Sequence, residues 1–319
     1  MTQHSILKQR LVAAAMEAGA HKVGFAHAVE VDADNLGYYQ RWIAAGNNGG
    51  MGYLENHPAV RRDPRKLLEN AEAHTVMVCA FSYYHSETQS PDAARIAMYA
   101  HGSDYHEVLR QRLQTIKTLL ESEGCSARIC VDSAPLMERY WAVRAGIGFI
   151  GRNRMLIVPH MGSYFFLAEI ITDAPVEPDE PCTLSCGDCG RCTAACPGGA
   201  LRSPGGFDSR LCLSYLTIEH CGDLPATLTA SDGAPRPLCK ALGNRVYGCD
   251  ECQLVCPHNA NPPETAIAEF HMRPTLHTLT RERILAMTQA DFSEIFAHSA
   301  VKRTKLAGLQ RNAIRRSRT

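Results

Sequence analysis

Two short segments of the chain are rich in cysteine, at a spacing that suits metal binding. Residues 186–197 read CGDCGRCTAACP, with cysteines at 186, 189, 192 and 196 and a proline after the last. Residues 248–258 read GCDECQLVCPH, with cysteines at 249, 252 and 256, and a proline again follows. Thiolates are preferred ligands of zinc and of iron–sulfur clusters, so the first chemistry that this sequence suggests is metal chemistry.

The run C-x2-C-x2-C-x3-C-P is typical of bacterial ferredoxins with two four-iron clusters. In that pattern three close cysteines bind one cluster, and the cysteine before the proline binds the other. This crossing assigns a first cluster to Cys186, Cys189, Cys192 and Cys256. It leaves the second cluster one ligand short, with Cys196, Cys249 and Cys252. Candidates for the missing ligand are Cys212, Cys221 and Cys239, and chain length does not choose between them.

Other uses of cysteine fit the pattern less well. Zinc also binds paired C-x2-C sequences, but zinc sites rarely have a third cysteine at the next step or a proline after the last. A thioredoxin-like site uses one C-x2-C pair beside a βαβ unit rather than seven thiols. Disulfide frameworks belong to small secreted domains, whereas most of the 14 cysteines here cluster between positions 182 and 256 of a 319-residue chain. The clustering therefore favours iron–sulfur metal sites.

Composition and charge are those of an ordinary globular protein, with 45% hydrophobic and 21% charged residues. The 33 basic and 33 acidic residues cancel, so no overall charge points to nucleic acid or membrane. Residues 302–318 differ, because they hold basic but no acidic side chains and could neutralise RNA phosphates. The basic residues are Lys302, Arg303, Lys305, Arg311, Arg315, Arg316 and Arg318.

The amino-terminal segment SILKQRLVAAAMEAG has helical spacing and lacks the apolar run of an export signal. No segment reaches the roughly 20 apolar residues of a membrane helix. We therefore expect a soluble, cytoplasmic protein.

Residues 75–173 alternate between strand and helix patterns. TVMVCAF (75–81) and ARICVDS (127–133) predict strands, and MLIVP and SYFFLAEIITD predict a hairpin around residues 160–162. Residues 104–124 predict a helix between the first two strands. Its apolar face consists of Val108, Leu109, Leu113, Ile116 and Leu120. The alternation predicts an α/β fold with a mixed sheet.

Proline-rich breakers at 173–181 and 261–263 divide the chain into three parts. We predict an α/β domain over residues 1–177, a ferredoxin-like two-cluster domain over 178–262, and a helical, basic segment over 263–319. In the last part Thr288 and Asp291 have capping-box spacing, ahead of a helix with Phe292, Ile295 and Phe296 inward.

Three longer stretches resemble the epoxyqueuosine reductases, bacterial cobalamin-dependent enzymes of tRNA modification. They are VDSAPLMERYWAVRAGIGFIGRNRMLI (131–157), LCLSYLTIEH (211–220) and GNRVYGCDECQLVCPHN (243–259). A looser similarity runs through MGYLENHPAVRRDPRKLL and YAHGSDYHEVLR, so the resemblance covers roughly residues 50–260. Runs of this length are far more specific than a cysteine motif alone.

This resemblance implies the missing ligand and the reaction. The cysteine that opens CLSYLTIE in the family is a cluster ligand, so the second cluster would be held by Cys196, Cys212, Cys249 and Cys252. The implied reaction is the two-electron deoxygenation of epoxyqueuosine at the wobble position of tRNA to queuosine, the last step of queuosine biosynthesis. Cobalamin in its cob(I) state would attack the epoxide, and cysteine-ligated clusters would supply the low-potential electrons.

The resemblance also places a proton donor at Asp132, in the VDSAP motif. Epoxide opening creates an alkoxide that must be protonated, and a carboxyl desolvated by the corrinoid would have a raised pKa. From the residues alone, Asp132 and Ser133 before Pro135 favour a helix cap, whereas the resemblance favours catalysis. The cobalamin contacts implied by the family are Arg61, Tyr105, Asp132, Leu156, Leu167 and Ser214, the leucines through backbone groups.

We expect a monomer that acts on epoxyqueuosine-containing tRNA and takes electrons from an external low-potential donor. Longer members of the family continue into a helical-repeat extension, and this chain is expected to be a short form without it. Two rival interpretations are a corrinoid reductive dehalogenase, which uses the same cofactors but is expected to carry an export signal, and a non-catalytic iron–sulfur electron-transfer protein.

Overall fold

The computed structural model describes residues 3–69, 72–202, 206–230 and 233–314. Its α-helices are α1 (Gln3–Glu17), α2 (Ala33–Ala44), α3 (Pro58–Arg62), α4 (Tyr105–Ser122), α5 (Glu138–Arg144), α6 (Arg191–Ala195), α7 (Leu213–Ile218), α8 (Leu238–Leu242), α9 (Glu251–Leu254), α10 (Arg281–Leu285), α11 (Gln289–Ile295) and α12 (Lys305–Ala313). Its strands are β1 (Lys22–His27), β2 (Thr75–Ser82), β3 (Arg95–Ile96), β4 (Ala127–Cys130), β5 (Phe149–Ile150), β6 (Leu156–Ile157), β7 (Phe165–Thr172), β8 (Leu201–Arg202), β9 (Gly206–Phe207), β10 (Thr227–Thr229), β11 (Pro235–Pro237) and β12 (Arg245–Tyr247).

The central sheet has four strands in the order β1-β2-β7-β4, and each neighbouring pair is antiparallel. The α/β class expected from the sequence is confirmed, but the central sheet is not mixed. Strands β2 and β4 run parallel to each other across the α4 crossover, yet β7 lies between them and pairs with both. Among the described residues, parallel pairing is confined to β3 and β12, outside this sheet.

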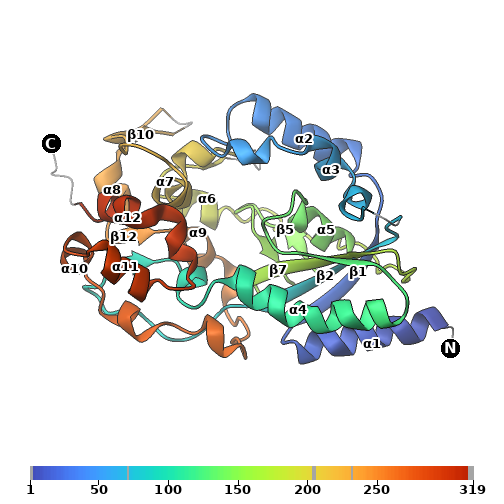
Figure 1. Cartoon of the computed structure of the whole chain (residues 1–319). Coiled ribbons are helices and arrows are strands. Elements are labelled where there is room, and N and C mark those ends of the chain that lie inside the picture. The colour runs from blue at the N-terminus through green and yellow to red at the C-terminus, as the bar shows by residue number, and fades with distance from the viewer. Residues whose placement is uncertain (1–2, 70–71, 203–205, 231–232, 315–319) are drawn as a thin grey trace.

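Helices cover both faces of the central sheet. Figure 1 shows α1 and α4 on one face and α5, with α2 and α3 beyond it, on the other. The side chains that α4 buries are Val108, Leu109, Leu113, Ile116 and Leu120, as its periodicity predicted. Strand β2 is buried along its whole length, because both of its faces meet helices. Side chains at the ends of β4 and β7 therefore lie between two packed layers.

The hairpin predicted around residues 160–162 is wrong in its strand pairing. The turn itself exists, since Val158 and Gly162 form an isolated antiparallel bridge. Strand β6 pairs with β5, however, and β7 leaves the turn to enter the central sheet. The apolar run of β7 favours the sheet interior, where both of its faces are buried.

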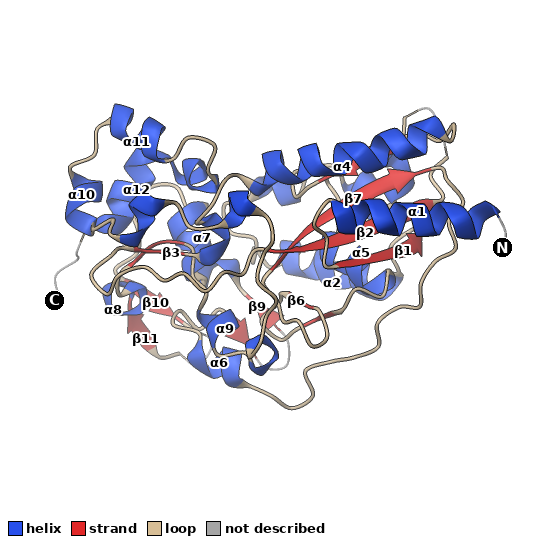
Figure 2. Ribbon diagram, turned by 90° about the horizontal axis from the view of Figure 1, so that it is seen from below, coloured by secondary structure: helices blue, strands red, loops and turns tan. Residues whose placement is uncertain are grey.

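The cysteine-rich region and the C-terminal helices pack together at the other end of the molecule (Figure 2). One core joins β12 and residues 94–100 to apolar side chains of residues 272–313. Within it, α11 begins with the predicted capping box of Thr288 and Asp291, and Phe292 and Phe296 are buried. The division into three domains, at residues 177/178 and 262/263, remains a prediction.

The basic C-terminal side chains do not all face solvent as free charges. Arg303 forms a salt bridge with Glu219 at 2.8 Å. Arg311 donates to the carbonyl of Leu216 in α7 at 3.0 Å and to those of His220 and Gly222, beyond the end of α7, at 2.7 and 2.8 Å. Residues 315, 316 and 318 lie outside the described residues. Two of the seven predicted phosphate contacts thus already have protein partners.

None of the helices in the described ranges is long and apolar enough to cross a membrane.

Candidate functional site

Four cysteines from the two motifs converge on one enclosed space. Cys192 lies in α6 and Cys256 follows α9, two short helices that pack together. Burial raises the pKa of the Cys256 thiol, and the neighbouring thiols of the first motif raise it further. The small cavity between them, of about 20 Å³, is lined by Cys186, Cys189, Cys192 and Cys256 together with Arg152, Asn153, Ile157, Arg191, Pro257 and His258. Converging thiols at one cavity suit a four-iron cluster.

A second, more buried group consists of Cys252 and three neighbouring cysteines. Burial raises the pKa of the Cys252 thiol above its usual range, and neighbouring thiols add to this effect. Those neighbours are Cys196, Cys212 and Cys249. Neither Cys221 nor Cys239 is among the groups that raise the pKa of Cys212, Cys249 or Cys252. The structure thus brings Cys212 to the place that the resemblance gives it, while its ligation to iron remains a prediction.

The backbone before α7 holds Cys212 in place. The buried Asp208 accepts a bond from the backbone N–H of Arg210 and pairs with the guanidinium groups of Arg202 and Arg210 at 2.6 and 2.9 Å. Leu213 and Leu216 then anchor α7 in a core against which Cys196, Cys212 and Cys249 pack. Cys212 is the residue that caps the start of α7, so the helix fixes its direction.

Asp132 lies two residues beyond β4, in the left-handed region with φ +52°. Its backbone N–H donates to Glu138 Oε1 at 2.6 Å. Its carboxylate Oδ2 accepts the Tyr105 hydroxyl at 2.5 Å and lies 3.3 Å from His106 Nε2. More than half of the side chain, 55%, remains exposed. The carboxyl is therefore bonded by Tyr105 and His106 on one side and exposed to an incoming molecule on the other.

The helix-cap alternative for Asp132 and Ser133 is wrong. Helix α5 begins only at Glu138, its N-cap is Met137, and no side chain caps it. Ser133 Oγ instead accepts a bond from Arg110 at 2.6 Å. The VDSAP segment is a loop held by its neighbours and not the start of a helix.

The charges around Asp132 determine where protons reside. Burial acts to raise its pKa, but hydrogen bonds from His106 and Tyr105 outweigh burial, and the net shift is downward. Burial acts to lower the pKa of His106, but bonds to Asp104 and Asp132 prevail and raise it to about 9. His106 Nδ1 is 2.7 Å from Asp104. At neutral pH the proton of this pair therefore resides on His106, and the raised pKa expected for an Asp132 carboxyl against the corrinoid remains a prediction.

The predicted corrinoid contacts occupy several elements around this loop. Tyr105 bonds Asp132 directly and stacks on Phe166, with ring centroids 4.3 Å apart. Arg61, at the end of α3, donates to the carbonyls of Asn56 and Tyr53 at 3.0 and 3.1 Å. Both Arg61 and Asp132 influence the pKa of the Tyr53 phenol, so they face a common region.

The remaining predicted contacts are not joined to Asp132 by direct bonds. Leu156 and Leu167 belong to the core on the α5 face of the sheet. Leu167 is the one residue of β7 that is not fully buried. Ser214 lies in α7, directly after Cys212 and Leu213. For these three residues, contact with a corrinoid remains a prediction.

Sequence reasoning missed three residues next to Asp132. His106 follows Tyr105 at the start of α4, and its role needs the spatial approach of a loop 26 residues later. Glu138 was hidden in the apolar stretch of α5. Glu169 had a visible signal, because it is the single acidic residue in the buried run FFLAEIIT of β7.

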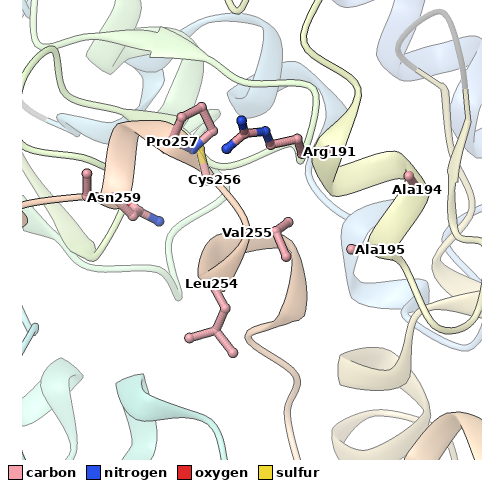
Figure 3. A pocket seen from close by; sticks show the side chains of 9 residues that line it. Arg191, Ala194, Ala195, Leu254, Val255, Cys256, Pro257 and Asn259 are labelled. Carbon is pink, nitrogen blue, oxygen red and sulfur yellow. The ribbon is translucent and has the colours of Figure 1, made fainter.

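An open hollow lies beside the first cysteine group. It has a volume of about 730 Å³ and is lined by residues of α6 and by residues 254–260. Figure 3 shows the Arg191 side chain extended toward Cys256 and Pro257 at its edge. Leu254, on the same rim, is 64% exposed. A thiol of the first group thus lies at the molecular surface.

Comparison with known proteins gives consistent matches. The family model described as "Epoxyqueuosine reductase QueG, DUF1730" matches residues 61–133, and that of a "4Fe-4S double cluster binding domain" matches residues 185–259. An epoxyqueuosine reductase of Leadbetterella byssophila is 38% identical over 275 residues, which is 86% of this chain and 86% of that protein.

Two solved structures share the fold over 98% of the chain. One is an epoxyqueuosine reductase with an epoxyqueuosine-modified tRNA-Tyr stem loop, at TM-score 0.82 and 33% identity, with 80% of that chain covered. The other, from Bacillus subtilis, has TM-score 0.81, 32% identity and 81% coverage. In that protein the loop carrying the catalytic aspartate is swung out of the active site.

Proposed function

We propose a mechanism by which this chain, which belongs to the epoxyqueuosine reductase family, reduces the epoxide of epoxyqueuosine in tRNA to give queuosine. It is an oxidoreductase with two four-iron clusters. The observation that carries the proposal is the Asp132 carboxyl, which is exposed on one side and bonded by Tyr105 and His106 on the other.

The two cysteine groups are the proposed cluster sites. The first cluster is bound by Cys186, Cys189, Cys192 and Cys256, and the second by Cys196, Cys212, Cys249 and Cys252. Electrons from an external low-potential donor enter at the first cluster, because Cys256 borders the surface hollow. They pass to the second cluster, whose thiols are more buried. Cluster sulfurs also accept backbone N–H groups, as Cys196 does from Ala200 at 3.3 Å, and such bonds tune the reduction potential.

The residues around Asp132 suit a cobalamin site. The register that pairs Cys130 with Glu169 brings the start of the Asp132 loop toward Leu167, where β7 is incompletely covered. Arg61, Tyr105, Leu156, Leu167 and Ser214 are the proposed contacts of the corrinoid. When bound, cobalamin in its reduced state supplies the nucleophilic, low-potential centre that opens an epoxide.

The chain's own contribution to the chemistry is proton supply. Removal of the epoxide oxygen as water consumes two electrons and two protons. His106, with a pKa of about 9, holds a proton beside Asp132 at neutral pH, and this proton passes through the Asp132 carboxyl to the departing oxygen. Asp104 keeps the imidazole oriented by its 2.7 Å contact with Nδ1. Tyr105 donates to the same Asp132 oxygen and fixes its position.

The surroundings of the reaction follow from its substrate. Because tRNA is a cytoplasmic molecule, we propose that the enzyme acts in the cytoplasm. We also propose that it acts as a monomer. We propose the same three-part organisation as above, with the α/β part (1–177) binding cobalamin, the ferredoxin-like part (178–262) binding the clusters, and residues 263–319 packing beside them.

The test is turnover of epoxyqueuosine-containing tRNA by the anaerobically reconstituted enzyme, with cobalamin added or omitted. Asp132→Asn should lower kcat by about 10²–10⁴-fold, the range for loss of a general acid. Ser133→Ala is the matched control on the same loop and should leave kcat unchanged, since Ser133 contacts only Arg110 among the bonds described. Undiminished turnover by Asp132→Asn with intact clusters, or turnover that ignores cobalamin, would refute the mechanism.

A further inference from the structure

A carboxylic acid without a usual partner lies in the middle of the central sheet. Glu169, in β7, is 0% exposed and is paired in register with Val78 of β2 and Cys130 of β4. Neither of its carboxyl oxygens has a hydrogen-bond donor among the described residues. Buried carboxyls without partners are costly, so such a group calls for an explanation.

The group nearest in chemistry to Glu169 is the carboxyl of Glu138. Side chains alternate along a strand, so Glu169 faces the same side of the sheet as Leu167 and Ile171, which is the α5 side. Glu138 is the first residue of α5, and among the charged groups around Glu169 its carboxyl acts most strongly on the Glu169 pKa. Two neighbouring buried carboxyls repel each other when both are ionised, so at least one of them keeps its proton.

Burial favours the protonated forms of this pair. It raises the pKa of Glu169 far above the usual value for a carboxyl and that of Glu138 to about 8. The other charged or titratable groups around the pair are Asp132, Arg139, Tyr105, Cys130 and Cys79. Only Arg139 among these is a cation, and it lowers the pKa of Glu138 less than burial raises it.

Glu138 has a second bond, and that bond reaches the proposed active site. Its Oε1 accepts the backbone N–H of Asp132 at 2.6 Å. Asp132 has φ +52°, and a non-glycine residue stays in this region only where surrounding contacts hold it. The Glu138 bond is such a contact, made to the backbone of the strained residue itself.

We propose that Glu138 is the positioning residue of the Asp132 loop, and that the buried Glu169 supports Glu138 by sharing a proton with it. Glu138 holds the loop in the position where the Asp132 carboxyl meets Tyr105 and His106. In the Bacillus subtilis relative the catalytic loop is swung out of the active site, so in that protein the loop has a second position. Loss of the Glu138 bond shifts the population toward an outward loop and removes Asp132 from the reaction.

This inference rests on Asp132 acting as proton donor, so the experiment is a double-mutant cycle that tests both. Single-turnover rates on epoxyqueuosine-containing tRNA are measured for Glu138→Ala, Asp132→Ala and the double variant, all reconstituted with clusters and cobalamin. Glu138→Ala should lower the rate at least about tenfold, with KM for tRNA and the cluster spectrum unchanged. In the Asp132→Ala background the same substitution should have no further effect.

Two conservative variants separate positioning from packing. Glu138→Gln keeps an acceptor oxygen for the Asp132 N–H and an amide donor toward Glu169, so it should stay within about threefold of the wild-type rate. Glu169→Gln should behave alike, because its amide can donate to Glu138. These variants also keep the test valid if Glu138→Ala does not fold.

The outcomes distinguish the two levels of the argument. An undiminished rate for Asp132→Ala would overturn the proton-donor assignment. A low rate for Asp132→Ala with an equal, additive loss from Glu138→Ala in both backgrounds would overturn the positioning role alone. A loss in Glu138→Gln as large as in Glu138→Ala would also overturn it, because the acceptor oxygen would then not be the feature that matters.

Discussion

The crossed arrangement of the cysteines predicts how pairs of alanine substitutions combine. Cys186 and Cys256 belong to different sequence motifs but are proposed ligands of one cluster. Cys186 and Cys196 share a motif but are assigned to different clusters. A cluster that one substitution has already abolished cannot be lost again, so two substitutions in one cluster are not additive.

The expected magnitudes follow from two clusters of four irons, which hold eight iron atoms per chain. Cys186→Ala should reduce the iron content to about four atoms per chain, because one of two clusters is lost. The pair Cys186→Ala with Cys256→Ala should again leave about four, whereas Cys186→Ala with Cys196→Ala should leave almost none.

The assay is the iron content per chain after anaerobic reconstitution, with the spin count of the reduced protein as an independent measure. Cys221→Ala and Cys239→Ala are matched controls and should retain all the iron, since neither thiol lines the cavity of the first group or is among the groups that raise the pKa of Cys212, Cys249 or Cys252. The opposite order of the two pairs, with iron retained for Cys186 and Cys196 but lost for Cys186 and Cys256, would refute the crossed assignment.

Two further predictions concern charge and packing. The pKa of His106 is raised to about 9 from an ordinary 6.5, so its contribution to stability should be complete below pH 6.5 and lost as the pH rises through about 9. Denaturant unfolding of wild type and His106→Gln across that range should show that the difference between their free energies of unfolding shrinks. A difference that stays constant with pH would contradict the assignment. Arg311→Ala should lower the free energy of unfolding by about 2–4 kcal/mol, because three carbonyls lose their donor. Lys302→Ala, at an exposed position, should change it by less than about 0.5 kcal/mol, and equal effects of the two would disprove the role of Arg311.

Local patterns predicted the elements well where one physical rule dominated. The buried face of α4 follows from helical periodicity, and the α11 capping box follows from the spacing of Thr288 and Asp291. The pairing of β7 between β2 and β4 could not be read in the same way. An apolar strand fits any interior position, and which neighbour it takes depends on contacts far apart in sequence.

The candidate site shows the same division between local and tertiary information. The cysteine spacing predicted how the seven thiols of the two motifs gather, because the ligand geometry of a cluster constrains the spacing itself, whereas Cys212 was identified only through the family resemblance. The lowered pKa of Asp132 could not be foreseen from the sequence, since it depends on hydrogen bonds from His106 and Tyr105, which approach from another element. Glu138 was missed for this reason too, whereas Glu169 was marked by the apolar run around it but not by its neighbour Glu138, which lies on another element.

The packing of α12 bears on when iron can be delivered to a newly made chain. Asn312 donates to the carbonyls of Thr217 and Val246 at 2.7 and 2.8 Å, so α12 closes over α7 and β12. These elements adjoin Cys212 and Cys249. At about 5–20 residues per second, a ribosome needs about 3–13 s to proceed from residue 249 to residue 313. During that interval α7 and β12 have been synthesised but α12 has not, so the second cysteine group is not yet covered by this helix.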